Sequence, residues 1–460
     1  MKTKSMNPII LLIILLGYTT LPANEGNYVI ITEPQYVDAH SFQQFVDWRK
    51  NRFDVTVKTI DEIGNSQEEI ESFIKEMHVT NQDTIKYLLF VGTPWGENGI
   101  AYDTNMIGIE SYPTYTTYGQ INKQQALDNY FSDPTKPYVR PRMEISVGVF
   151  PIRDVEALDN IVAKTMYTES GIDQYPSDVT VFGSSYEAGF NLNVQNSMAN
   201  WSTQLPEVII HDLYPGTPSD LISLVNQEKS KLITYYGHGL HESWHMEGGS
   251  FTKENISQLE NTSVFPMIIS GSCLTASFVD SNNSLGADWM GSANGASVYV
   301  GNIHTIALTA TYDYMEALPR YYKDQSIRNI GDLVETLRDS VLYYHSMASM
   351  YEFPGIFGDP ALNFRGDFSG SAQITTKSSI EVSNHKINLR HLDQNTLSIT
   401  LSQSNDWRAK VISISGREVF SSNLDVASGE STITLPVLTS GVYFFVVSSD
   451  TEKHSFVIRY

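Results

Sequence analysis

The sequence predicts an α/β protein, a parallel sheet flanked by helices, followed by a small C-terminal β-sandwich. Two observations support this fold class. Short apolar segments typical of buried strands alternate with amphipathic helical segments over most of the chain. Near residue 368 the composition changes, and short alternating strands separated by turns follow. With 460 residues, the chain is long enough for two or three compact units.

The first strands and helices of the α/β region follow one another at short intervals. Ser66 is expected to cap the second helix, with Glu69 at its third position completing a capping box. The predicted elements, in order, are a strand at 28–32, a helix at 40–50, a strand at 55–60, a helix at 66–77 and a strand at 87–91.

The same alternation resumes after an aromatic, turn-rich stretch at 93–141. In parallel sheets, functional residues lie just beyond the carboxyl ends of the strands. His238 follows one predicted strand and Cys273 follows another, so both are candidate functional residues. The predicted elements here are a strand at 145–150, a helix at 154–167, and strands at 179–182, 232–236, 267–270 and 297–300.

The C-terminal region is predicted to be a separate domain. Residues 367–372 resemble a linker, and the segment that follows has the strand spacing of a β-sandwich. We therefore predict a sandwich domain at 374–460 and a larger domain at 24–366, with subdomains at 24–172 and 173–366. The expected strands of the sandwich are 397–401, 411–414, 432–435, 443–447 and 455–458.

The N-terminus has the features of a signal peptide, predicted at residues 1–23. Lys2 and Lys4 precede an apolar run at 9–16, which is too short to span a bilayer, and Ala23 suits cleavage. Cleavage would remove two lysines and no acidic residue, taking the formal net charge from -22 to -24. Such a charge argues against nucleic acid or anionic lipid as a partner, and no stable membrane insertion is expected.

The single cysteine and one histidine have the surroundings of a catalytic pair. Cys273 has no partner for a disulfide within an exported chain, so it is either an inert buried thiol or a reactive one. His238 lies between two glycines, and glycine lets the backbone turn sharply close to a substrate. A cysteine peptidase needs a thiolate, an imidazole base and amides directed at the oxyanion, for which Gly239 and Cys273 are candidates.

Seven segments of the larger domain match a known family in order: Phe45–Trp48, Tyr87–Gly92, Val147–Pro151, Tyr236–Gly239, Leu259–Pro266, Cys273–Phe278 and Phe357–Pro360. Through them, the sequence from residue 27 to 365 resembles the gingipain family of cysteine peptidases. The resemblance implies a caspase-like α/β fold with His238 and Cys273 as the catalytic dyad and Glu187 holding the histidine. Val149 stands where the family's Gly-Arg-Phe strand has arginine.

One departure from the family pattern concerns specificity. Arginine-specific members place an acidic residue shortly after the glutamate, but residues 188–206 contain no Asp or Glu. A preference for substrates with a basic residue before the scissile bond is therefore not expected. The C-terminal region resembles the sorting domain of type IX secretion substrates, through Ser415–Val419, Leu438–Tyr443 and Phe456–Tyr460. This likeness implies export through the outer membrane, with the secretion machinery as a partner.

Two alternatives to the thiol mechanism remain open. His241-Glu242-Ser-Trp-His245 matches the H-E-x-x-H zinc peptidase motif, but the motif requires a helix, and glycines lie close on both sides. A non-catalytic surface binding protein is the second alternative, supported by 26 tyrosines and the aromatic stretch Tyr112–Tyr118.

These observations together predict a secreted or cell-surface cysteine endopeptidase that cleaves protein or peptide substrates through a thioester. No cofactor and no metal is required for this chemistry. Structural calcium at loop acids such as Asp128 stays open, although their spacing forms no recognisable calcium loop.

Overall fold

The structure is a computed structural model. It describes residues 25–80, 85–92, 144–172, 175, 178–183, 188–277, 284–303, 305–306, 308–344 and 355–365, together with eight strands and adjoining residues between 380 and 459. The predicted signal peptide, the 367–372 linker, Tyr112–Tyr118, Asp128 and Glu187 lie outside the described residues.

The larger region is built on a ten-stranded sheet that consists of two parallel halves. Strands are parallel within each half, whereas β13 pairs with β12 in the antiparallel direction. The first half is β2 (Asp54–Thr59), β1 (Asn27–Thr32), β3 (Ile85–Gly92), β4 (Ser146–Pro151) and β13 (Gly355–Phe357). The second half is β12 (Val298–Gly301), β11 (Met267–Gly271), β7 (Leu232–Tyr236), β5 (Val179–Gly183) and β6 (Ile210–Leu213).

The predicted α/β fold is confirmed, and the reversal at β13 is a feature that the strand pattern did not reveal. Two successive helices, α10 (Leu308–Tyr322) and α11 (Ile330–Tyr344), separate β12 from β13. One helix returns the chain to the amino edge of β12, and the second brings it back to the carboxyl edge. A strand that starts from that edge must run opposite to β12, which is the pairing observed.

The helices near the N-terminus begin and end close to the predicted residues. Helix α1 spans His40–Lys50, as predicted, and α3 spans Gln67–Thr80. The Glu69 amide donates to Ser66 Oγ (3.2 Å), and the Ser66 amide donates to Glu69 Oε2 (3.0 Å). This reciprocal pair is the expected capping box, and it satisfies two amides that the first turn leaves without helical partners.

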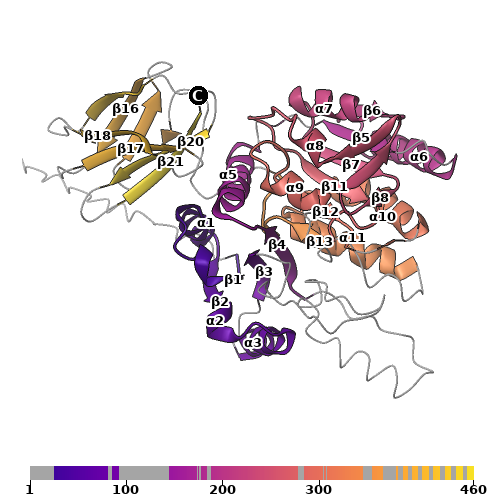
Figure 1. The fold of residues 1–460 in the computed structure, drawn as a ribbon, viewed down its shortest axis with the longest axis horizontal. Helices are drawn as coiled ribbons and strands as arrows, with labels where there is room; N and C mark the ends of the chain where they lie inside the picture. The colour runs from indigo at the N-terminus through magenta and orange to yellow at the C-terminus, as the bar shows by residue number, and fades with distance from the viewer. Residues whose placement is uncertain are drawn as a thin grey trace, which may run out of the picture.

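The remaining helices cover both faces of the second half of the sheet. One core cluster joins the first half to α5, α7, α8 and α9, while the other packs α6, α10 and α11 against the opposite face of the second half. Figure 1 shows these helices around β5, β7, β11 and β12. Their bounds are α5 Val155–Gly171, α6 Ala188–Gln204, α7 Pro218–Asn226, α8 Lys253–Ile256 and α9 Leu285–Gly291.

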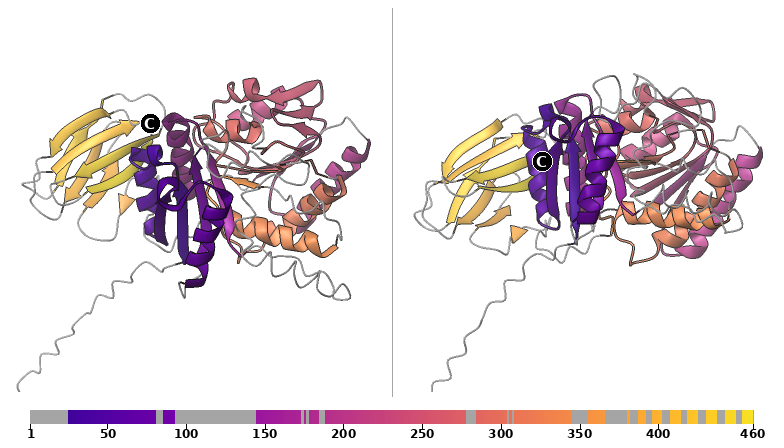
Figure 2. Two further views of the ribbon diagram at one scale, coloured as in Figure 1. Left: turned by 60° about the horizontal axis from the view of Figure 1, so that its bottom comes forward. Right: turned by 90° about the horizontal axis from the view of Figure 1, so that it is seen from below.

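The C-terminal strands form two four-stranded antiparallel sheets, as the sandwich prediction requires. Their inner faces share one apolar core, to which both sheets contribute. The sandwich lies beside α1 of the larger region in both figures (Figures 1 and 2). One sheet is β14 (Ile380–Glu381), β15 (Ile387–His391), β16 (Thr396–Leu401) and β19 (Glu430–Thr434); the other is β18 (Glu418–Leu424), β17 (Trp407–Ser413), β20 (Val442–Ser448) and β21 (Lys453–Arg459).

Within the described residues, no helix has the length and apolar character needed to cross a membrane.

Candidate active site

Three neighbouring strands of the second half end at the same level of the sheet. Gly183 at the end of β5 pairs with Tyr236 at the end of β7, which pairs in turn with Gly271 at the end of β11. His238 and Cys273 each follow their strand end by two residues. Because paired parallel strands lie about 4.8 Å apart, this register brings the histidine and cysteine loops side by side.

Gly239 packs closely against the loop that carries Cys273. A Cβ atom at this position would lie 2.9 Å from the Cys273 carbonyl oxygen, 2.7 Å from Ser272 Oγ and 2.8 Å from Thr275 Cγ2. No larger residue fits without moving backbone, so glycine is required here for close approach rather than for a special φ angle. The contact directly joins the loop that carries His238 to the loop that carries Cys273.

Cys273 is the only cysteine of the chain, and its side chain is half-buried. The Ile306 amide donates to its sulfur (3.3 Å), and the thiol donates to the Ile306 carbonyl (3.7 Å). The next residue, Leu274, has φ of 62°, a left-handed conformation that is uncommon for a branched side chain. Such strain persists only where the surroundings enforce it, and it is frequent at functional sites.

His238 is half-buried at the start of a short hairpin formed by β8 (Gly239–Leu240) and β9 (Ser243–Met246). The His245 amide donates to the His238 carbonyl (3.0 Å), and the one proton of the Tyr235 hydroxyl is shared between the carbonyls of His238 (2.8 Å) and His245 (2.7 Å). The buried phenol therefore fixes the base of the hairpin, and the two imidazole rings lie 6.3 Å apart.

The hairpin pairing also determines where the Gly239 amide points. His238 and His245 form a hydrogen-bonded pair, so the next pair, Gly239 and Trp244, is of the non-hydrogen-bonded kind. The Gly239 N–H is therefore directed away from β9. This leaves the amide available to a ligand at the same loop that contacts Cys273.

A group of buried hydroxyls lies beneath the Cys273 loop. Ser270 Oγ, Ser272 Oγ and Thr275 Oγ1 are mutually within hydrogen-bond distance, at 2.7, 3.2 and 3.3 Å. The Trp244 indole N–H donates to Ser270 Oγ at 2.9 Å. These residues link the histidine hairpin to the cysteine loop, and sequence reasoning missed them. In the sequence, these hydroxyls could have been found from the small polar residues that begin at Ser270 and interrupt the apolar residues of β11.

The H-E-x-x-H motif does not lie on a helix. His241 and Glu242 form the turn between β8 and β9, and His245 is within β9, which pairs with β10 (Gly249–Thr252). Histidines placed on a turn and a strand lack the one-turn helical spacing that the zinc motif uses. Among the described residues, no group of three or more His, Cys, Asp or Glu side chains could hold a metal ion.

The first acidic residue after position 187 lies far from this edge of the sheet. Helix α6 starts beyond the carboxyl end of β5 and contains no Asp or Glu, and its 17 residues span about 25 Å. Glu207 follows it, near the amino end of β5, where the Val179 amide donates to the Ile209 carbonyl.

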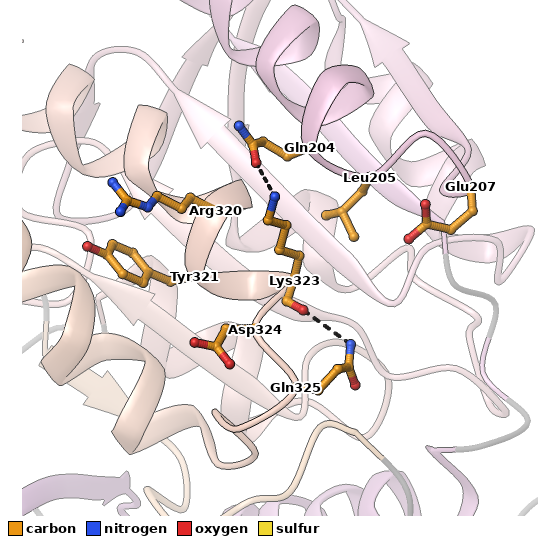
Figure 3. A pocket seen from close by; sticks show the side chains of 8 residues that line it. All are labelled: Gln204, Leu205, Glu207, Arg320, Tyr321, Lys323, Asp324 and Gln325. Carbon is orange, nitrogen blue, oxygen red and sulfur yellow. Dashed lines mark hydrogen bonds between the residues drawn. The ribbon is translucent and has the colours of Figure 1, made fainter.

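Glu207 lines a cavity of about 540 Å³ between the ends of α6 and α10. Figure 3 shows the side chains around this cavity. Arg320, Lys323 and Asp324 also line this cavity, and Lys323 Nζ donates to Gln204 Oε1 at 2.6 Å. It lies at the opposite edge of the sheet from Cys273, so we assign it no part in the candidate site.

Two of the solved structures with a similar fold are gingipain structures. The complex of the Porphyromonas gingivalis RgpB pro- and mature domains matches with a TM-score of 0.62 and 17% identity, covering 94% of this chain and 100% of that chain. The Arg specific cysteine proteinase gingipain R matches with a TM-score of 0.61 and 16% identity, covering 95% and 99%. These likenesses show the fold. Among curated proteins, none matches this chain.

Two family models match the sequence. The model for peptidase family C25 covers residues 21–365, and the model for the secretion system C-terminal sorting domain covers residues 393–459. The sorting domain marks the protein for type IX secretion to the cell surface or beyond. The domain boundaries given above stay predictions. The chain belongs to peptidase family C25, the gingipain family, and is a cysteine-type peptidase with a C-terminal secretion sorting domain.

Proposed function

We propose that this protein is an exported endopeptidase that hydrolyses peptide bonds through a thioester on Cys273, with His238 as general base and acid. The observation that carries the proposal is the register of β7 and β11. Tyr236 at the end of β7 pairs with Gly271 at the end of β11. His238 and Cys273 therefore each lie two residues beyond the ends of neighbouring strands. The contact of Gly239 with the Cys273 carbonyl brings the loops together.

The chemistry takes place in two steps. His238 accepts the thiol proton while the sulfur attacks the substrate carbonyl; the C–N bond then breaks, and His238 gives the proton to the leaving amine. In the second step, His238 takes a proton from water, which attacks the thioester and releases the carboxylic acid and the thiol. No metal or cofactor is needed in this sequence of steps.

The proposed oxyanion donors are the amides of Gly239 and Cys273. The Gly239 N–H points away from β9, as the hairpin pairing requires. Two amides at the developing negative charge would stabilise the tetrahedral intermediate, and the loss of one such donor typically costs about 100- to 1000-fold in kcat.

The proposed partner of His238 is Glu187. This residue lies outside the described residues, and its assignment depends on the family pattern and on chain position. Gly183, four residues earlier, pairs with Tyr236, so the segment that leads to Glu187 starts at the same edge as the His238 loop. A carboxylate near the imidazole would orient it and stabilise its charged form.

We do not extend the arginine specificity of gingipain R to this chain. A guanidinium in the pocket for the residue before the scissile bond requires a nearby carboxylate. Helix α6 supplies none, and Glu207 lies at the other edge of the sheet. Substrates with a neutral residue at this position are therefore expected to be preferred.

Hydrolysis of a mixed peptide library by the purified exported chain tests the proposal under reducing conditions. Cys273→Ala and His238→Ala should each lower kcat/KM by roughly 1000-fold or more, and a zinc chelator should have no effect. Activity that survives Cys273→Ala but is lost with the chelator would contradict the thiol mechanism. No turnover by any variant would favour a binding protein instead. The cleavage sites also report the preferred residue before the bond.

A further inference from the structure

The buried hydroxyls beneath Cys273 form a closed triangle that spans the nucleophile turn. Ser270 is the second-last residue of β11 and Thr275 follows Cys273 by two residues, so the triangle closes the turn on both sides of the cysteine. Ser270, Ser272 and Thr275 are 2%, 1% and 0% exposed, and these fractions exclude solvent as a competing partner.

Every hydroxyl of the triangle can be satisfied in one arrangement. Each hydroxyl donates one hydrogen bond and can accept two, so the three form a ring in which each donates to the next. Ser270 Oγ retains a lone pair, and the Trp244 indole N–H donates to it at 2.9 Å. Such a ring gains from mutual polarisation, whereas loss of one member leaves buried groups without partners.

Trp244 connects this ring to the loop that bears His238. The indole is fully buried, and its ring centroid lies 4.8 Å from that of Tyr235 and 5.5 Å from that of Phe182. It is within β9, the strand that pairs with Gly239. The hydroxyl of Tyr235 also donates to the His238 carbonyl. The same aromatic cluster therefore contacts both the base of the histidine hairpin and the hydroxyl triangle.

The backbone of the cysteine turn is held at further points. Asn302 Nδ2 donates to the Ser272 carbonyl (2.8 Å), and the Gly286 amide donates to the Thr275 carbonyl (2.8 Å). Held at these points, Leu274 retains its left-handed conformation, which persists only where the surroundings enforce it.

We propose that Ser270, Ser272 and Thr275, anchored by Trp244, are positioning residues that set the distance between Cys273 and His238. The triangle rests on the proposed function, since it acts only through that pair. All of its members are neutral. The phenols packed on Trp244, Tyr235 and Tyr299, are also neutral, because burial raises the pKa of each, and the Tyr299 hydroxyl also interacts with Ser270 and Thr275. The triangle therefore acts by geometry and adds no charge beside the thiol.

Two substitutions at one position separate the hydroxyl from its packing. Thr275→Val keeps the branched shape but removes the hydroxyl, whereas Thr275→Ser keeps the hydroxyl and removes the methyl group that faces Gly239. We expect Thr275→Val to lower kcat about 10- to 100-fold with KM within about threefold, because sub-ångström displacement of catalytic groups is this costly. Thr275→Ser should keep kcat within about threefold.

Alkylation of Cys273 by iodoacetamide at pH 6 gives an independent measurement. At this pH a thiol reacts quickly only when an imidazole shares its proton, so Thr275→Val should slow alkylation about tenfold. Ser272→Ala adds no atoms to the site and should show the same loss of kcat. The matched control is Thr180→Val, which breaks a buried Thr180–Ser230 hydroxyl pair away from the site. It should lower the melting temperature without changing kcat or alkylation.

Wild-type kcat in Ser272→Ala would overturn the inference, and so would equal losses in Thr275→Val and Thr275→Ser. The Cys273→Ala variant, measured alongside, separates this failure from failure of the proposed function. If Cys273→Ala remains active, the thiol mechanism itself is wrong. If Cys273→Ala is inactive and Ser272→Ala is normal, only the positioning role is wrong.

Discussion

The two halves of the sheet differ in how they use buried polar groups. The first half is tied together by charges: Arg49, at the C-terminal end of α1, binds both Glu169 on α5 and Asp359 after β13, and all three are fully buried. Arg52 binds Glu169 as well. The carboxyl edge of the second half, in contrast, has neutral hydroxyls, glycines and a strained turn.

The buried charges orient elements that are far apart in the sequence. Tyr28 on β1 donates to Asp359 (2.8 Å), and Trp48 on α1 donates to Glu169 (2.9 Å). Burial raises the pKa of Asp359, and Arg49 opposes that shift. A buried ion pair adds little net stability over an apolar replacement, but the loss of one partner is severe. Asp359 belongs to the Phe357–Pro360 segment of the family resemblance, and the structure assigns that segment to packing.

This difference indicates that the first half of the sheet is a structural frame, whereas the second half carries the candidate catalytic residues. Buried charged groups suit this frame, because their directional hydrogen bonds fix helices and strands that do not need to move. The neutral hydroxyls hold the Cys273 turn without placing a further charge beside the thiol, so proton exchange is left to Cys273, His238 and the proposed partner Glu187. Substitutions in the frame should therefore change stability, whereas substitutions at the edge should change activity.

Arg49→Met should produce the largest effect and tests the frame. Glu169 and Asp359 would lose their shared cation, so we expect the free energy of unfolding to fall by about 3 to 5 kcal/mol, measured by urea denaturation. The kcat of the folded fraction should be unchanged. Lys50→Ala is the control, because its pair with Asp47 is exposed and should change stability by less than about 0.5 kcal/mol. A large loss of kcat in Arg49→Met would break the proposed division.

Gly239→Ala tests the opposite half. The new Cβ would clash with the Cys273 carbonyl and the Ser272 hydroxyl, so the histidine hairpin must move away. We expect kcat/KM to fall about 100-fold, with a smaller effect on melting temperature. Gly291→Ala is the control, since its nearest neighbour would be Ala157 Cβ at 3.6 Å. Near-normal activity in Gly239→Ala would show that the two loops are not coupled as described.

Lys164→Met gives the smallest effect and tests how the halves are joined. Lys164 on α5 is buried, and its ammonium donates to the carbonyls of Trp289 (3.2 Å), Met290 (2.7 Å) and Ser292 at the end of α9. Burial lowers the pKa of Lys164 to about 7, from 10.5. The folded state therefore disfavours the charged form.

The sign of the pH dependence follows from this shift. Between pH 7 and 10.5 the unfolded chain holds a proton that the folded chain has released, so stability increases with pH across this window. Below pH 7, Lys164 is charged in both states, so the free-energy cost of burying its charge is fully present. We therefore expect the wild type to gain stability relative to Lys164→Met as the pH rises through this window. Parallel stability–pH curves for the two proteins would contradict this expectation.

Much of the fold could be predicted from local patterns. The helix at 40–50 and the strand at 232–236 coincide with the observed elements, because apolar periodicity and capping residues are local properties. Helices α6, α10 and α11 were not predicted. Helix α6 contains almost no charge contrast between its faces, so its sequence has little helical periodicity to detect. The hairpin after His238 was also missed, since its strands are too short to show alternation.

The candidate site likewise has one part that the sequence predicts and another that only the tertiary structure shows. Cys273 and His238 could be named from the sequence, because a lone cysteine and a glycine-flanked histidine each follow an apolar strand. Their proximity depends on which strands are neighbours, and strand order is decided by long-range packing that no local pattern encodes. The hydroxyl triangle depends in addition on a turn with one left-handed residue, which lets Ser270, Ser272 and Thr275 converge.

The sequence by itself determined the alternation of strands and helices, the chemistry of the two candidate catalytic residues and the family to which they point. The tertiary structure alone decided the antiparallel junction at β12 and β13, the register that aligns Tyr236 with Gly271, and the burial of Arg49 between two carboxylates. The physical reason is range: periodicity and capping act over a few residues, whereas strand order and charge burial depend on segments hundreds of residues apart.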